Sequence, residues 1–139
     1  MYIDLLIYFK MKVSDFITSF LISKKIKYVY AVTGGASLHL IHSAMNNKKL
    51  NVIFPIHEQT CAMSADAYSR VSHNVGAAFA TSGPGATNLA TGICGAYFDS
   101  VPVMDITGQV STNRSKGSTG VRQIGFQETD RVDMYKSVT

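Results

Sequence analysis

Residues 51–88 read NVIFPIHEQTCAMSADAYSRVSHNVGAAFATSGPGATN, and this segment is the most informative about the fold. It contains two short apolar runs, Val52–Pro55 and Val75–Ala80, and a helical pattern follows each run. Apolar runs that are each followed by a helix predict parallel strands, with helices covering both faces of the sheet. Ligands of such sheets bind beyond the carboxyl ends of the strands. Glu58 and the turn Thr81–Asn88 are both predicted at that edge.

The same alternation continues on both sides of this stretch. It predicts helices at Ser14–Lys24, Ala36–Met45, Glu58–Val71, Ala86–Phe98 and Glu128–Lys136, and strands at Tyr28–Val32, Val52–Pro55, Val75–Ala80 and Val101–Thr107. Ser14 is expected to cap the first helix, with Phe16, Ile17, Phe20 and Leu21 on one face. Gly108–Gly120 reads as a polar loop. The predicted fold class is therefore α/β, in three layers, with a mostly parallel sheet between helices.

The composition excludes several classes of protein. With 46% hydrophobic and 16% charged residues among 139, the chain reads as one globular domain. The net charge of +4 comes from scattered lysines and arginines, so we expect no nucleic-acid partner. No apolar run approaches the ~20 residues of a membrane helix, so no membrane partner is expected either. Cys61 and Cys94 lack C-x-x-C spacing, which favours two buried free thiols and a cytoplasmic location.

The two ends of the chain differ from its middle. Residues 1–10 are apolar, but they include Asp4 and lack a basic start and a cleavage site, so they make a poor signal peptide. Since Met11 opens a better helix start, we interpret 1–10 as an N-terminal extension or an incorrectly assigned start. Residues 11–139 form the predicted domain. The sequence stops after Val138-Thr139 without a closing Gly or Pro, so the domain is expected to be incomplete at its C-terminus.

Glu58 is the first candidate for chemistry. A glutamate at a helix start is often present only because it interacts favourably with the helix dipole. Here the preceding residues are apolar, and Gln59–Met63 provide no cationic partner. Burial disfavours a charged carboxylate, whereas a helix N-terminus favours it. Glu58 can exchange a proton near neutral pH only if burial dominates, so the structural and catalytic readings both stay open.

Two other segments have both a functional and a structural interpretation. The glycines of Ser82–Asn88 allow close backbone approach, Pro84 stiffens the turn, and the following helix start could hold an anion. Since neither G-x-G-x-x-G nor a Walker sequence is present, a tight turn is the simpler interpretation, as it is for Thr33–Ala36. Phe126 and Gln127 could reach a neighbouring site. Alternatively, Phe126 is a hydrophobic staple for the last helix.

Two further hypotheses find little support. His57 and Cys61 would suit a thiol hydrolase, but Cys61 falls inside a helical pattern and no nucleophile elbow is present. His39, His42 and His57 do not have the spacing of a zinc site, so we expect no metal ligand on this chain.

Taken together, the motifs resemble the N-terminal pyrimidine-binding domain of thiamine diphosphate enzymes, above all the acetolactate synthase group. The similarity rests on VTGGAS, HEQ, ADAYSR, ATSGPGATN, DSVPVMDITGQV and FQET, at residues 32–37, 57–59, 65–70, 80–88, 99–110 and 126–129. These motifs follow the family's order and spacing over roughly Val13–Thr139. The resemblance implies the thiamine diphosphate-binding fold, with a pyrimidine-type domain that is truncated at its C-terminus.

The resemblance also implies roles for individual residues. Glu58 matches the catalytic glutamate, which hydrogen-bonds the aminopyrimidine ring and favours the tautomer that deprotonates the thiazolium carbon. Further cofactor-binding positions are Gly34, Gly35, Pro84 and Asn88. Phe126 matches a residue near the substrate, and Gln127 matches a glutamine near the glutamate.

The implied cofactor is thiamine diphosphate, with Mg²⁺ held by a diphosphate-binding domain that this sequence lacks; a need for FAD is left open. The implied partners are a 2-oxo acid substrate, the diphosphate-binding domain or subunit, and further copies of the chain in a homo-oligomer. Thr33 and Ser111 stand where acetolactate synthases usually have proline, and residues 122–125 depart from the usual approach to FQET. These departures leave the substrate and product undefined.

The leading hypothesis is the pyrimidine-binding half of a carboligase or decarboxylase, inactive without its other half. A second hypothesis is a non-catalytic fragment or interaction module that associates with full-length relatives. A nucleotide-binding Rossmann domain is disfavoured, because no acidic residue follows a G-x-G-x-x-G turn.

Overall fold

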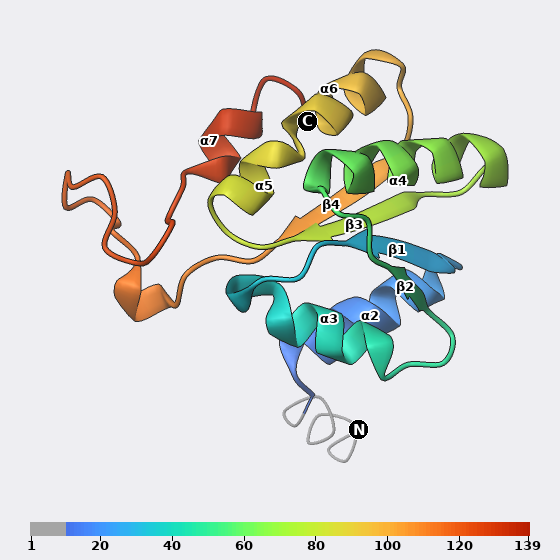
Figure 1. The fold of residues 1–139 in the computed structure, drawn as a ribbon, viewed down its shortest axis with the longest axis horizontal. Coiled ribbons are helices and arrows are strands. Elements are labelled where there is room, and N and C mark those ends of the chain that lie inside the picture. The colour runs from blue at the N-terminus through green and yellow to red at the C-terminus, as the bar shows by residue number, and fades with distance from the viewer. Residues whose placement is uncertain (1–10) are drawn as a thin grey trace, which may run out of the picture.

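A computed structural model describes residues 11–139 and shows a four-stranded sheet in the order β2-β1-β3-β4 (Figure 1). The strands are β1 (Tyr28–Ala31), β2 (Asn51–Ile53), β3 (Gly76–Ala80) and β4 (Val103–Thr107). Every neighbouring pair is parallel. The predicted α/β class with a parallel sheet is therefore confirmed, whereas the interpretation of residues 1–10 lies outside the described residues.

Helices cover both faces of the sheet, as predicted. Helices α2 (Val13–Ser23) and α3 (Leu38–Met45) lie on one face. The opposite face carries α4 (Glu58–Ser72), α5 (Pro84–Asn88), α6 (Ala90–Phe98) and α7 (Arg131–Tyr135). Among residues 11–139, no helix combines the length and the apolar character that crossing a membrane requires.

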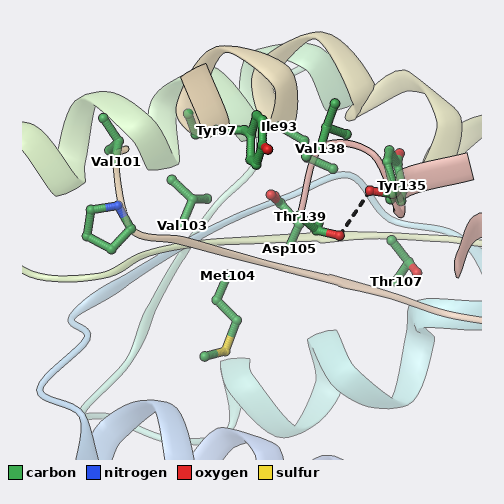
Figure 2. A pocket seen from close by; sticks show the side chains of 12 residues that line it. Ile93, Tyr97, Val101, Val103, Met104, Asp105, Thr107, Tyr135, Val138 and Thr139 are labelled. Carbon is green, nitrogen blue, oxygen red and sulfur yellow. Dashed lines mark hydrogen bonds between the residues drawn. The ribbon is translucent and has the colours of Figure 1, made fainter. Parts of the chain in front are cut away.

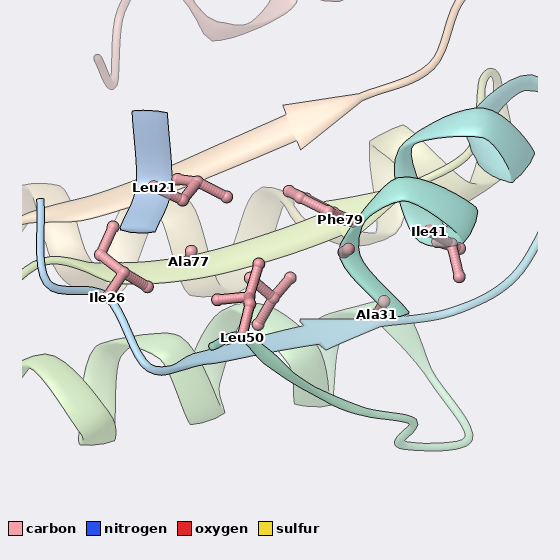
Figure 3. Packing of buried hydrophobic residues seen from close by; sticks show 9 residues of the cluster. Leu21, Ile26, Ala31, Ile41, Leu50, Ala77 and Phe79 are labelled. Atoms are coloured by element: carbon pink, nitrogen blue, oxygen red, sulfur yellow. The ribbon is translucent and has the colours of Figure 1, made fainter. Parts of the chain in front are cut away.

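The sheet separates two apolar cores, and β3 contributes to both. Ala77 and Phe79 belong to the core beneath α2 and α3, which Figure 3 shows. Ala78 and Ala80 belong to the core beneath α4 and α6. This division follows from the alternation of side chains along a strand. Since all five residues of β3 are buried, this strand is the centre of the domain.

The predicted cap of the first helix is wrong, and only part of its predicted apolar face packs inward. Helix α2 begins at Val13, so Ser14 lies inside it and caps nothing. Ser14 is buried instead, and the Ser43 hydroxyl of α3 donates a 2.8 Å hydrogen bond to its Oγ. Leu21 is buried and Ile17 packs against the same core, as expected, whereas Phe16 and Phe20 are 49% and 37% exposed. The face that packs inward carries Ser14, Thr18 and Leu21, because α2 meets α3 through this partly polar stripe.

Several predicted boundaries also shift. A 3₁₀ turn at Gly35–Ser37 precedes α3, and the predicted helix 86–98 is divided at Leu89 into α5 and α6. Strand β2 ends at Ile53 rather than Pro55. Strand β4 begins at Val103 rather than Val101.

The last helix is shorter than predicted, because its predicted first residue, Glu128, forms hydrogen bonds with the preceding loop instead. The Glu128 carboxylate accepts hydrogen bonds from the backbone N–H groups of Lys116 (2.7 Å) and Ile124 (3.1 Å) and from the Ser115 hydroxyl (3.0 Å). Burial works against the charged form, but these donors outweigh it and lower the pKa of Glu128. Glu128 therefore organises the loop after β4, and helix α7 starts only at Arg131.

Strand β4 has an acid at its centre. Asp105 pairs in register with Ala78 of β3, and burial raises the pKa of its carboxyl group to about 7. Its Oδ1 atom is buried, and within the described part of the chain it has no hydrogen-bond partner. An acid in this setting costs stability whenever it is charged.

Replacing Asp105 with Asn should therefore flatten the pH dependence of stability. The unfolded carboxyl group titrates near 3.8 and the folded one near 7. Between these values the unfolded chain binds fewer protons than the folded chain, so the free energy of unfolding falls as pH rises. Denaturant unfolding from pH 4 to pH 8 should show this fall in the native protein and in the exposed-acid control Asp133→Asn. An equal fall in Asp105→Asn would contradict the assignment.

Candidate functional site

Glu58 is the first residue of α4, just past the carboxyl end of β2. The preceding residue, His57, is the N-cap: its Nδ1 accepts a 3.1 Å hydrogen bond from the Gln59 N–H. The glutamate itself is buried, with 9% of its surface exposed. The predicted position of Glu58, past the carboxyl end of a strand and at the start of a helix, is confirmed, and its role in binding or catalysis stays a prediction.

One carboxylate oxygen of Glu58 is fixed and the other is open. The Asn88 side-chain amide donates a 3.0 Å hydrogen bond from Nδ2 to Oε2. Asn88 ends α5, so this bond joins the connection after β2 to the connection after β3. Within residues 11–139 no hydrogen bond reaches Oε1, and this atom is not among the buried unpaired ones. Oε1 is thus available to accept a hydrogen bond from a ligand.

Thr81 joins the turns that follow β1 and β3. The Ala36 N–H donates a 3.1 Å hydrogen bond to Thr81 Oγ1. A Cβ atom on Gly34 would lie 2.4 Å from Thr81 Cβ, and one on Gly85 would lie 2.7 Å from Thr81 Cγ2 and 3.2 Å from Glu58 Oε1. Both positions therefore need glycine. Because Gly34 and Gly85 have no side chains, the two turns can lie close to each other and to Glu58.

A pocket of about 430 Å³ opens beside Thr81. Four of the predicted site residues line it, and they share it with residues of the loop after β4. The lining includes Gly34, Gly35, Thr81, Ser82, Gln109, Arg114, Phe126 and Gln127. Glu58, Pro84 and Asn88 do not line this pocket. Thr81 connects the two groups, because its side chain fills the space that a Cβ atom on Gly34 or on Gly85 would need.

Gln127 has an unusual backbone geometry, and its neighbour Phe126 is exposed. Gln127 has a φ of 56°, in the left-handed region, and a Cβ on Gly83 would lie 2.6 Å from its Cβ. Such conformations cost energy for a residue other than glycine and cluster at functional sites. Phe126 is 81% exposed, so the alternative that it staples the last helix is wrong. Pro84 is exposed at the first position of α5, where proline is favoured.

The sequence reading missed three contributors. Thr81 precedes the Ser-Gly-Pro-Gly turn. Its place between a buried strand and a Gly-rich turn could have identified it as a site residue from the sequence. Gly85 belongs to the same turn. Arg114 lies in a polar loop without any pattern, and only the folded loop brings it to the pocket.

The hypothesis of a thiol hydrolase fails. Burial, followed by the nearby Glu58 and Asp105, raises the pKa of the Cys61 thiol to about 12, so no thiolate forms near neutral pH. Cys61 is buried and Cys94 is partly buried, and both are free thiols. Within the described residues, no group of three or more His, Cys, Asp and Glu side chains could hold a metal ion.

Replacing Gly34 with Ala should destabilise the protein by roughly 1–3 kcal/mol, since the new methyl group would overlap Thr81. Gly35→Ala is the matched control, because a Cβ there meets nothing within 4 Å. The free energy of unfolding of both variants, measured with denaturant, tests this difference. Equal losses at the two positions would show that the Thr81 contact does not set the requirement for glycine.

Comparison with protein families gives a match over residues 11–134, to the family described as thiamine pyrophosphate enzyme, N-terminal TPP binding domain. Several curated relatives are acetolactate synthases. The chloroplastic acetolactate synthase of Arabidopsis thaliana is 37% identical over 131 residues, which cover 92% of this chain and 18% of that protein. The probable acetolactate synthase large subunit of Methanocaldococcus jannaschii is 38% identical over 129 residues, covering 93% and 21%.

A third relative, the acetolactate synthase large subunit of Cyanidium caldarium, is 47% identical over 94 residues, which cover 66% of this chain and 16% of that protein. The chain thus spans about a fifth of the length of these curated relatives.

Proposed function

The chain belongs to the thiamine pyrophosphate enzymes through their N-terminal TPP-binding domain, and from this we propose that it is the pyrimidine-binding half of a 2-oxo acid carboligase or decarboxylase. The cofactor of this family is thiamine diphosphate, also called thiamine pyrophosphate. The observation that carries the proposal is the Glu58 carboxylate, which has one oxygen fixed by Asn88 and the other open.

The residues at this edge fit an aminopyrimidine ring. Such a ring is flat and has N–H donors on its edge. The missing side chains of Gly34 and Gly85 leave room for close approach beside Thr81. Oε1 of Glu58 can share a proton with a ring nitrogen: the nitrogen accepts from the protonated carboxyl group, or donates to the carboxylate once the nitrogen carries the proton. Gly35, Phe126 and Gln127 line the adjoining pocket, which suits a substrate next to the cofactor. Pro84 is proposed only to stiffen the turn that positions Asn88.

When bound, thiamine diphosphate would supply a carbon nucleophile that attacks the carbonyl group of a 2-oxo acid. The protein's own part is to hold the ring and to manage a proton at Oε1 of Glu58. The Asn88 amide keeps the carboxylate in one orientation, so its free oxygen is aimed in advance. The burial of Glu58 limits competition from water for this hydrogen bond.

We further propose that another domain covers this edge. Ile56, two residues before Glu58, is fully exposed, and Phe54 and Met63 are exposed by 43% and 47%. Exposed apolar side chains grouped near a site are typical of interaction surfaces. The proposed partner holds the diphosphate and Mg²⁺, within a cytoplasmic homo-oligomer. A flavin requirement is not part of the proposal.

Replacing Glu58 with Gln in the enzyme purified with its natural partner chains should lower kcat by about 100-fold or more, because the amide cannot exchange a proton with the cofactor. Asn88→Ala should cause a smaller loss, since it only releases the carboxylate from its orientation. Carboligation of pyruvate, followed by product formation, measures both effects. Asp133→Asn, on the exposed surface of α7, is the control. Full turnover in Glu58→Gln would instead support a non-catalytic interaction module.

The chain alone should bind thiamine diphosphate negligibly, even with Mg²⁺. The pyrimidine contacts proposed above hold only one end of the cofactor, and residues 11–139 present no cluster of metal ligands. Isothermal titration calorimetry of the single chain, with cofactor and Mg²⁺ present, tests this expectation. Micromolar binding would contradict the proposal that the site is shared with another domain.

A further inference from the structure

The connection between β4 and α7, residues 108–130, is a loop whose two ends lie close together (drawn in orange and red in Figure 1). Arg131 donates a hydrogen bond from its guanidinium group to the Gly108 carbonyl oxygen at 2.6 Å. Thr107, the last residue of β4, and Tyr135 of α7 line the same pocket, and Figure 2 shows them side by side. Surface loops with neighbouring ends and internal contacts are frequently functional.

Glu128 anchors this loop from inside. Its Oε1 accepts hydrogen bonds from the Ser115 hydroxyl at 3.0 Å and from the Lys116 backbone N–H at 2.7 Å, and its Oε2 accepts one from the Ile124 N–H at 3.1 Å. Burial of Glu128 works against the charged carboxylate, but the donors lower its pKa overall, so it is charged near neutral pH. Hydrogen bonds to a charged acceptor are about twice as strong as those between neutral groups. One carboxylate therefore holds two separate parts of the loop together.

The anchored loop forms one side of the 430 Å³ pocket beside Thr81. Seven of the twelve residues that line this pocket belong to the loop, so the shape of the pocket depends on where the loop lies. Phe126 and Gln127 are among them, and Glu128 follows directly in the chain. The other side of the pocket comes from the turns after β1 and β3, which include Gly34 and Thr81.

Gln127 is the point at which the loop meets the turn after β3. A Cβ atom on Gly83 would lie 2.5 Å from the carbonyl oxygen of Gln127 and 2.6 Å from its Cβ, so the two backbones are in close contact. Gln127 also has a φ of 56°. A residue other than glycine keeps such a conformation only where the surrounding contacts hold it. The hydrogen bonds of Glu128 supply contacts of this kind one residue away.

We propose that Glu128 is a positioning residue, whose carboxylate holds this loop against the turn after β3 and so shapes the pocket for a 2-oxo acid. The role of the pocket rests on the proposed function, in which the substrate binds there. Glu128 is not among the residues that line the pocket, so its effect passes through Phe126 and Gln127. Without the carboxylate the loop can move away, and the substrate binds less tightly. Glu58 keeps its own contact with Asn88, so proton exchange there persists.

Replacing Glu128 with Gln tests the proposal, because the amide keeps the shape of the side chain but not its charge. The carboxylate uses both oxygens as acceptors, whereas an amide has one oxygen and must turn its NH₂ group toward a donor. In the enzyme purified with its natural partner chains, the KM for pyruvate should rise about tenfold while kcat changes by less than about twofold. A change that only destabilised the fold would reduce the amount of active enzyme and leave KM unaltered.

Two further variants calibrate this effect. Asp130→Asn makes the same acid-to-amide change in the same loop and should leave KM and kcat unaltered, because its carboxylate is exposed and pairs with Lys116 Nζ. Ser115→Ala removes one of the three donors and should raise KM roughly threefold. If Glu128→Gln does not fold, Ser115→Ala decides the matter, and an unaltered KM in that variant would overturn the proposal.

Hydrogen exchange of backbone N–H groups tests the anchor without any turnover. In Glu128→Gln the N–H groups of Lys116 and Ile124 should exchange about tenfold faster or more, whereas those of β3 should not change. Unaltered exchange at both groups, or faster exchange throughout the domain, would overturn the anchor. An unaltered KM despite local opening would overturn its effect on the substrate. Full turnover in Glu58→Gln, by contrast, would refute the proposed function and leave the exchange result standing.

Discussion

Helix α4 lies close enough to β3 and α6 to place Glu58 only because small residues form the contacts. A Cβ on Gly76 of β3 would lie 2.0 Å from the carbonyl oxygen of Ala65 in α4. A Cβ on Gly92 of α6 would lie 2.3 Å from Ala62 Cβ. Larger side chains at these positions would push α4 outward, and interiors this tightly packed do not absorb such a change without strain. The first residue of α4 would move with the helix.

The geometry of the site follows from this close packing. With α4 in place, Glu58 comes within reach of Asn88 at the end of α5, and the two connections at the carboxyl edge become one unit. Thr81 extends this unit to the turn after β1, because Gly34 and Gly85 leave space for it. Tyr135 then ties α7 to the same region, since its hydroxyl donates to the carbonyl oxygen of Ala86. Four separate segments are thus joined by hydrogen bonds in which at least one partner is a side chain.

The success and failure of the sequence predictions have physical causes. The order of strands and helices was predictable, because buried parallel strands give continuous apolar runs such as Val75–Ala80. The polar part of the buried face of α2 was not, since Ser14 and Thr18 pair with polar atoms that the sequence pattern does not reveal. The shortened α7 was missed for a similar reason. Glu128 looked like a helix residue, but its carboxylate binds the backbone of a loop more than ten residues earlier.

The class of the fold, the family resemblance and the candidate glutamate could all be predicted from the sequence, because they depend on local patterns and on motifs in order. It also indicated that Gly34 and Gly35 share a turn. Which atoms meet followed only from the folded structure: Asn88 binds Oε2 of Glu58, Thr81 requires glycine at position 34 but not at 35, and Oδ1 of Asp105 has no hydrogen-bond partner among residues 11–139. Such contacts join residues far apart in the chain, and their distances are fixed only when the sheet and both helical layers pack together.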